Sequence, residues 1–311
     1  MLDDGHQDEE GDADHQETMQ TFDTFTFNPV SLSAGVVWDF KTGYNMGLSL
    51  AHAERAPNAA ELFSAGPHIA IRTFEVGTLF AINEEEGKQH LDYEGQAKKE
   101  TSNNIDLSLR KFDGDVGFVV NLFYNKVSNY YSLNNTGLTT DDLFKQEPEA
   151  QDAEQEHEHA EQLPVFIYEQ EDATLYGLEV ELAWRITPGI TLTTWGDTVN
   201  AKRDNGGYLP RTSPTRLGAD LNVERGAWNA QLTALNYFDQ KNTAINETAT
   251  QGYTLMDARV SYAIPTLGGT TTVYIAGTNL TDQEARAHTS YLKNSAPQPG
   301  RNFKVGLHAT F

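Results

Sequence analysis

The stretch "LEVELAWRI" (Leu178–Ile186) alternates between apolar side chains and the set Glu179, Glu181, Ala183 and Arg185. A period of two residues is that of a β-strand with one apolar face, and it disfavours a helix. The same alternation returns along most of the chain, in "YNMGLSLAH" (44–52), "NIDLSLR" (104–110), "LGADLNVE" (217–224), "TLMDARVSYAI" (254–264) and "NFKVGLHATF" (302–311).

The connections between these segments favour a membrane barrel over a soluble sandwich. Turn sequences such as "TPG", "DNGG" and "ERGA" contrast with long polar segments elsewhere. Long, numerous strands with short turns at one end and long loops at the other are typical of an antiparallel transmembrane β-barrel that is apolar outside and polar inside. A β-sandwich with its polar face in water stays open on pattern alone. We predict about ten to twelve strands, near 25–40, 43–54, 70–82, 101–112, 115–132, 165–186, 189–203, 213–225, 227–240, 252–265, 270–281 and 300–311.

Two segments interrupt the strands. Residues 1–24 are expected to form an acidic, histidine-containing extracellular segment, and the barrel to occupy 25–311 with a long acidic external loop at about 133–163. Aromatic pairs such as Trp38 with Phe40, and Tyr130 with Tyr131, are expected to serve as interface girdles.

Composition narrows the function classes. The chain has 311 residues, a net charge of −23 and no cysteine, so no disulfide supports it and nucleic-acid phosphate would be repelled. We expect a chain with this negative charge to attract cations. The sequence contains no apolar run long enough for a transmembrane helix, and its opening residues lack the basic and apolar regions of a secretory signal.

Four stretches, in order, resemble the C-terminal barrel portion of TonB-dependent outer-membrane receptors. They are "ERAPNAAELFSAG" (54–66) with "TFEVG" (73–77), "KKETSNNIDLSL" (98–109), "LYGLEVELAWRIT" (175–187) and "AGTNLTDQEARAHTSYLKNSAPQPGRNFKVGLHATF" (276–311). A terminal aromatic, here Phe311, on an amphipathic last strand is typical of this family. The resemblance spans residues 25–311, and "RAPNAAELFSAGPHIAIRTFEVG" (55–77) is most similar to the zinc-uptake (ZnuD-like) group.

The resemblance implies a receptor in the outer membrane of a Gram-negative cell, surrounded by lipid, that transports its ligand and is not an enzyme. Such receptors have about 22 strands around an N-terminal plug, and a segment next to the plug contacts the TonB–ExbB–ExbD complex. This sequence offers about half the strands and no plug, so we expect an incomplete barrel from a longer receptor. Coupling to TonB would belong to the plug.

The candidate metal ligands are histidines and acids in the two interrupting segments. Zinc binds imidazole nitrogen and carboxylate oxygen. The first segment holds His6 and His15 among eight carboxylates from Asp3 to Glu17, and "EQEHEHAE" holds His157 and His159 with Glu156 and Glu158. We predict that these segments collect divalent cations near the barrel mouth; solvated acidic loops with incidental histidines are the alternative.

His68, in "SAGPHIA" (64–70), is the candidate for a specific site, because the resemblance implies that a histidine in this region contributes to the metal path. Its partners would come partly from the plug. We expect zinc, or another divalent metal, as transported ligand and no catalytic cofactor. His52 is expected at the membrane interface and His308 in the barrel lumen.

Other function classes stay open. A siderophore or haem receptor would share every barrel feature, although an anionic chelate would be repelled by the acidic loops. An outer-membrane barrel enzyme would need a catalytic constellation at the rim, for which His288, Ser290 and Asp282 are near enough in sequence to be considered. A passive porin is a further alternative.

Overall fold

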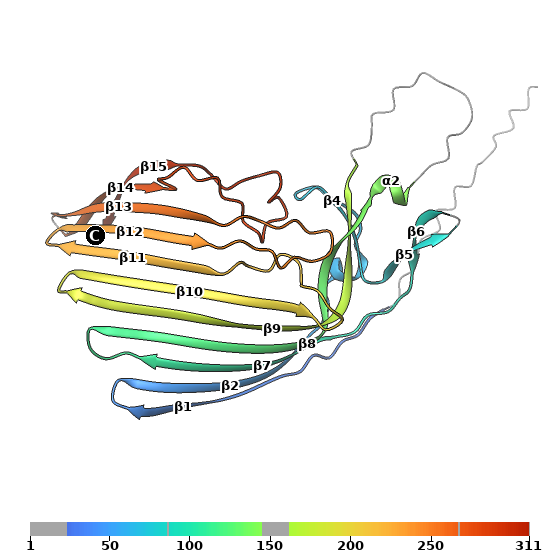
Figure 1. Cartoon of the computed structure of the whole chain (residues 1–311), viewed down its shortest axis with the longest axis horizontal. Helices are drawn as coiled ribbons and strands as arrows, with labels where there is room; N and C mark the ends of the chain where they lie inside the picture. The colour runs from blue at the N-terminus through green and yellow to red at the C-terminus, as the bar shows by residue number, and fades with distance from the viewer. Residues whose placement is uncertain (1–23, 86, 145–161, 267, 311) are drawn as a thin grey trace, which may run out of the picture.

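A computed structural model describes residues 24–85, 87–144, 162–266 and 268–310 of the chain. Within these residues the long strands form one antiparallel sheet in which each lies beside the next in sequence (Figure 1), while β5 (Phe80–Glu85) and β6 (Lys88–Tyr93) form a separate pair. The predicted all-β, antiparallel class is therefore confirmed. The long strands are β1 (Ser31–Lys41), β2 (Tyr44–Arg55), β7 (Glu100–Lys111), β8 (Val116–Thr139), β9 (Pro164–Thr187), β10 (Ile190–Arg203), β11 (Arg216–Arg225), β12 (Trp228–Tyr237), β13 (Tyr253–Thr266), β14 (Gly269–Thr278) and β15 (Asn302–Thr310).

The sheet is open at both edges in the part of the chain that the structure describes. β1 pairs only with β2, and β15 pairs only with β14. The unpaired sides of β1 and β15 present backbone N–H and C=O groups that only another strand can fully satisfy within a membrane. The sheet is thus part of a barrel rather than a closed one, as expected.

Tight turns join the strands at one end of the sheet, which we call the turn end (Figure 1). Gly189, between β9 and β10, has a φ of +89°, and a Cβ added to it would lie 2.5 Å from the carbonyl oxygen of Glu224. Glycine avoids both the strained backbone and this collision. The long connections 56–99, 204–215, 238–252 and 279–301 lie at the opposite end, which we call the loop end, as do the described residues 140–144 and 162–163.

The two faces of the sheet differ in polarity. One face, the apolar face, carries a row of aliphatic register partners on five neighbouring strands: Val36, Leu48, Leu107, Leu122 and Leu178. The first four are 39–60% exposed, so no described segment of the chain covers them. On the opposite, polar face, Asp220 accepts hydrogen bonds from Gln231 Nε2 at 2.7 Å and from Thr233 Oγ1 at 2.6 Å. An uncovered apolar face opposite a hydrogen-bonded polar face requires lipid on one side only.

Aromatic residues surround the turn end of the apolar face. Trp38 and Phe40 are 64% and 42% exposed, with ring centroids 5.7 Å apart. Trp228 and Tyr262 form a second such pair at 4.7 Å. The exposed position predicted for Trp38 and Phe40 is confirmed.

The same prediction is wrong for Tyr131. This residue is 6% exposed, its hydroxyl donates to the carbonyl of Lys98 at 2.8 Å, and the Arg55 guanidinium lies 5.4 Å from its ring centroid. β8 continues to Thr139, past the predicted end at residue 132, and the 56–99 connection covers this extension. Tyr131 is therefore part of the loop-end packing rather than of an interface girdle.

The main hydrophobic core lies at the loop end, between the connections and the adjoining end of β9. Its buried members are Leu62, Phe74, Val76, Leu79, Phe80, Leu143 and Val165. The small elements at this end of the molecule are α1 (Ala59–Phe63), β3 (Ala65–His68), β4 (Thr73–Val76), β5 (Phe80–Glu85), β6 (Lys88–Tyr93) and α2 (Thr140–Leu143), and all but β3 contribute side chains to the core. α1 begins with a capping box in which Asn58 and Glu61 bond each other's backbone N–H groups.

This core explains two wrong boundaries. The predicted strand at 70–82 is two strands, β4 and β5, because the chain turns at Gly77, whose N–H donates to Ser64 O at 2.6 Å. The polar loop predicted from residue 133 begins later, because Leu133 and Leu143 are buried at 5% and 6% exposure. Residues 133–144 contain the end of β8 and α2 instead.

Candidate ligand-binding site at the loop end

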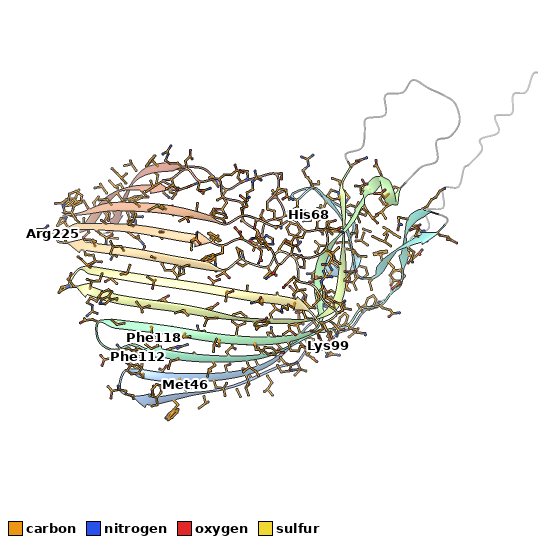
Figure 2. The ribbon with its side chains drawn as sticks, viewed as in Figure 1. Met46, His68, Lys99, Phe112, Phe118 and Arg225 are labelled. Carbon is orange, nitrogen blue, oxygen red and sulfur yellow. The ribbon has the colours of Figure 1, made fainter. Side chains whose placement is uncertain are left out.

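A polar cavity of about 780 Å³ lies at the loop end, against the part of β8 and β9 that extends toward the connections. In Figure 2, Lys99 and His68 mark this end of the molecule and Arg225 marks the turn end. Amide and carboxyl side chains supply much of the wall, including Asn134, Asn135, Glu169, Gln170, Glu171 and Asn246. Such a wall offers mainly oxygen acceptors and amide donors to a ligand.

Hydrogen bonds fix the wall in place across three strands. Ser132 Oγ donates to Glu171 Oε1 at 2.6 Å, and Asn134 Nδ2 donates to Glu169 Oε2 at 2.6 Å. Arg203 Nη2 donates to Asn134 Oδ1 at 2.7 Å, while its Nε lies 3.1 Å from Glu171 Oε2, too bent for a hydrogen bond. Arg203 therefore neutralises Glu171, whereas Glu169 forms no ion pair within the described residues.

A guanidinium stacked on an aromatic ring lies near this cavity. Arg211 Cζ is 4.0 Å from the ring centroid of Tyr291, and Phe166 meets that ring edge-on at 6.2 Å. Arg211 Nη2 donates to the carbonyl of Leu133 at 3.1 Å. Among the described residues this guanidinium has no carboxylate partner, so it retains its positive charge beside a small pocket of about 80 Å³.

Glu247 joins the connections around that pocket. Its carboxylate accepts from Lys293 Nζ at 2.9 Å and from the backbone N–H groups of Arg211 at 2.9 Å and Ala244 at 3.0 Å. Burial raises the pKa of Glu247, but the donors and the adjacent His288 outweigh it and lower the pKa to about 2. Glu247 thus ties the 204–215 and 279–301 connections to its own.

His288 is a structural residue of this cluster. It is 2% exposed; its Nδ1 lies 3.0 Å from the hydroxyl of Thr250, and its Nε2 lies 3.2 Å from Glu247 Oε1 without hydrogen-bond alignment. Ser290 Oγ instead accepts from Leu292 N, and Asp282 Oδ1 accepts from Arg301 N. The three residues considered for catalysis are thus engaged with different partners.

His68 lies at the end of β3, where it pairs with Thr73 of β4 and is exposed. The described residues contain no cluster of three or more histidine, cysteine or acidic side chains around it, or elsewhere, that could hold a metal ion. Its predicted role in a metal site stays a prediction.

The other candidate ligands lie outside the described residues. They are His6, His15, His157, His159, Glu156 and Glu158. The flanking elements are described: α2 ends at Leu143, β9 begins at Pro164, and β1 runs from the loop end toward the turn end. Both histidine-containing segments are therefore attached to the loop end.

In the part of the chain that the structure describes, no helix is long and apolar enough to cross a membrane. A family model for the β-barrel of TonB-dependent receptor-like proteins matches residues 5–280. The chain belongs to this family. TonB-dependent receptors are transport receptors of the outer membrane, so the receptor class, the barrel and the non-enzymatic class expected from the sequence agree with the match.

Solved structures of TonB-dependent receptors share the fold. The copper transporter OprC superposes with a TM-score of 0.66 at 16% identity, over 89% of this chain and 38% of that one. The siderophore receptor PirA from Acinetobacter baumannii gives 0.62 at 16% identity, over 90% and 41%. The FrpB iron transporter from Neisseria meningitidis gives 0.58 at 13% identity, over 89% and 38%. The chain thus spans about two fifths of the receptors it matches.

These receptors do not single out the zinc-uptake group, since their names refer to copper, iron and siderophores. Sequence reasoning also missed Arg211, Glu247 and Lys293. These residues lie in polar connections that lack the apolar–polar alternation used to predict strands, so only the fold shows that they lie close together.

Proposed function

We propose that the chain is the barrel part of a receptor that takes up a metal ion, with zinc as the favoured cargo and the TonB–ExbB–ExbD complex as the energy source. The observation that carries the proposal is that both histidine- and acid-rich segments are joined to described elements at the loop end. The cavity at that end contains Glu169, which has no ion-pair partner among the described residues. Carboxylate and imidazole groups attract and bind divalent cations.

Zinc uptake is tested in the native host with the receptor gene intact or deleted. Uptake of radioactive zinc should fall on deletion and should require the proton-motive force. Unchanged uptake in a strain lacking other zinc receptors would exclude this cargo. Copper and ferric citrate, tested in parallel, identify a different metal.

A chelate receptor is the second candidate, and Arg211 favours it. A guanidinium stacked on Tyr291, and without a carboxylate partner in the described part of the chain, suits the carboxylate or phenolate of an anionic chelate. The full chain, purified in detergent, can be titrated with free zinc and with a ferric catecholate. Preferential binding of the catecholate, lost in Arg211→Gln but not in Arg225→Gln at the turn end, would replace zinc with a siderophore as the cargo.

A further inference from the structure

The apolar face changes character within four residues toward the loop end. Two residues beyond the aliphatic row lies a mixed row of register partners: Ala34, Leu50, Ile105, Tyr124 and Tyr176. Two residues further, β1 still carries an apolar residue, Leu32, but the next five strands carry a polar row: His52, Asn103, Lys126, Thr174 and Lys202. Aliphatic, then aromatic, then cationic side chains are the order expected where a membrane-facing surface leaves the hydrocarbon.

Three members of the polar row are arranged to hold an oxyanion. Lys126 Nζ forms an ion pair with Asp204, and Thr174 Oγ1 donates to the same carboxylate at 3.2 Å. Lys202, on the next strand, has its Nζ 5.9 Å from the ring centroids of Tyr176 and Tyr208, and it has no ion pair among the described residues. Lys126 and Lys202 are two strands apart, roughly 10 Å, so one anion between them is within reach of both side chains.

The Asp204 carboxylate is a weakly held occupant of this position. The side chains of Lys126 and Asp204 are 38% and 41% exposed. Ion pairs this accessible to water contribute little to stability. A stronger oxyanion can therefore replace the carboxylate at little cost.

A groove of about 460 Å³ runs down the apolar face from the polar row. Its walls include Leu32, Leu50, Ile105 and Tyr124, and its loop-end wall includes His52 and Lys126. An apolar groove that ends at a lysine matches a molecule with a hydrocarbon chain and an anionic head.

We propose that Lys126, Thr174 and Lys202 bind the phosphate of a membrane lipid whose acyl chain lies in this groove, and that the phosphate displaces Asp204. Phosphate carries more charge and more acceptor oxygens than a carboxylate, so it can bond both lysines and the threonine hydroxyl together. The site is on the opposite face from the cavity, and the inference rests on the barrel rather than on the transported cargo.

The test measures binding of dioleoyl phosphatidic acid to the full chain in detergent, with dioleoylglycerol as the phosphate-free lipid and inorganic phosphate as the chain-free anion. Phosphatidic acid should bind most tightly. The double variant Lys126→Ala/Lys202→Ala should weaken its binding roughly 10- to 30-fold. Lys41→Ala/Lys241→Ala removes the same charge from the turn end and from an outer connection, and should leave binding unchanged.

Asp204→Asn provides an arm that does not depend on the lysine variants folding. Removing the competing carboxylate should tighten binding of phosphatidic acid severalfold. Equal binding by wild type and the lysine variant, equal binding of dioleoylglycerol, or weaker binding by Asp204→Asn would each overturn the proposal. Inorganic phosphate binding as tightly as the lipid would reduce the site to a simple anion site.

Discussion

Lys293 Nζ donates to Glu247 Oε1 at 2.9 Å across 46 residues of sequence, and both side chains are less than one tenth exposed. This pair joins the connection between β12 and β13 to the connection between β14 and β15. Its position makes Glu247 the first residue to test.

Glu247→Gln should loosen the loop end without unfolding the sheet. The change leaves Lys293 buried without a counter-ion, and breaking a buried pair in this way costs about 3 kcal/mol. Amide hydrogen exchange should speed up in residues 238–252 and 279–301. Asp239→Asn is the matched control, because the Lys241–Asp239 pair is exposed at 78% and 51% and should change exchange little. Equal protection of these amides from exchange in Glu247→Gln and in the wild type would show that the Glu247–Lys293 pair does not hold the two connections together.

The stabilisation of the loop end by Glu247 should depend on pH. The folded pKa of Glu247 is lowered to about 2 from an ordinary value of 4.5, so its stabilising contribution is complete above pH 4.5 and is lost as the pH falls toward 2. Loop-end protection in the wild type should decline across that window. In Glu247→Gln, this loss of protection between pH 4.5 and 2 should be absent. If the two proteins had the same pH profile, the loss of protection would come from the protonation of other carboxyl groups.

The histidine-containing segments should account for much of the zinc that the chain binds. Replacing His6, His15, His157 and His159 by alanine should lower the zinc stoichiometry in calorimetric titration, because imidazole is lost as a ligand. The sheet should stay folded, since these residues lie outside the described strands. An unchanged stoichiometry would leave solvated acidic loops as the better interpretation.

His68 should separate a specific site from general cation collection. In the complete receptor, His68→Ala should reduce growth on limiting zinc more than it reduces total zinc bound, because the segments still collect metal that the site can no longer pass on. Imidazole coordination also resists salt, whereas exposed carboxylates are screened over about 8 Å at physiological ionic strength. Growth equal to wild type at matched receptor levels would assign His68 a packing role.

The sheet was predictable because its signal is local. A run such as Leu178–Ile186 must place one parity on each face, so the sequence alone predicts both the strand and its apolar side. The predicted ranges therefore overlap the long strands closely. They fail where strands leave the membrane-facing part, since Leu133 and Leu143 are buried by the loop-end core and not by a periodic neighbour.

The loop-end contacts were not predictable for the same reason. Lys293 and Glu247 carry no pattern of their own, and their distance in sequence conceals their contact. The polar row on the apolar face is similar: Lys126, Thr174 and Lys202 become neighbours only through the register of β8, β9 and β10. The acidic composition predicts an attraction for metal cations, but only the fold shows which lysine side chains lie together.

The open ladder has a consequence for assembly. Its path, β1, β2 and β7 to β15, contains eleven strands within the described residues, each antiparallel to the next. An odd number makes β1 and β15 run in the same direction. If two copies with the same orientation in one membrane closed a barrel, β15 of each copy would pair with β1 of the other. Both of these pairs would be parallel. A closed barrel in which every neighbouring pair is antiparallel needs an odd number of additional strands. A second copy of this sheet has an odd number of strands, but its strands would have the required direction only if the copy were inverted across the bilayer.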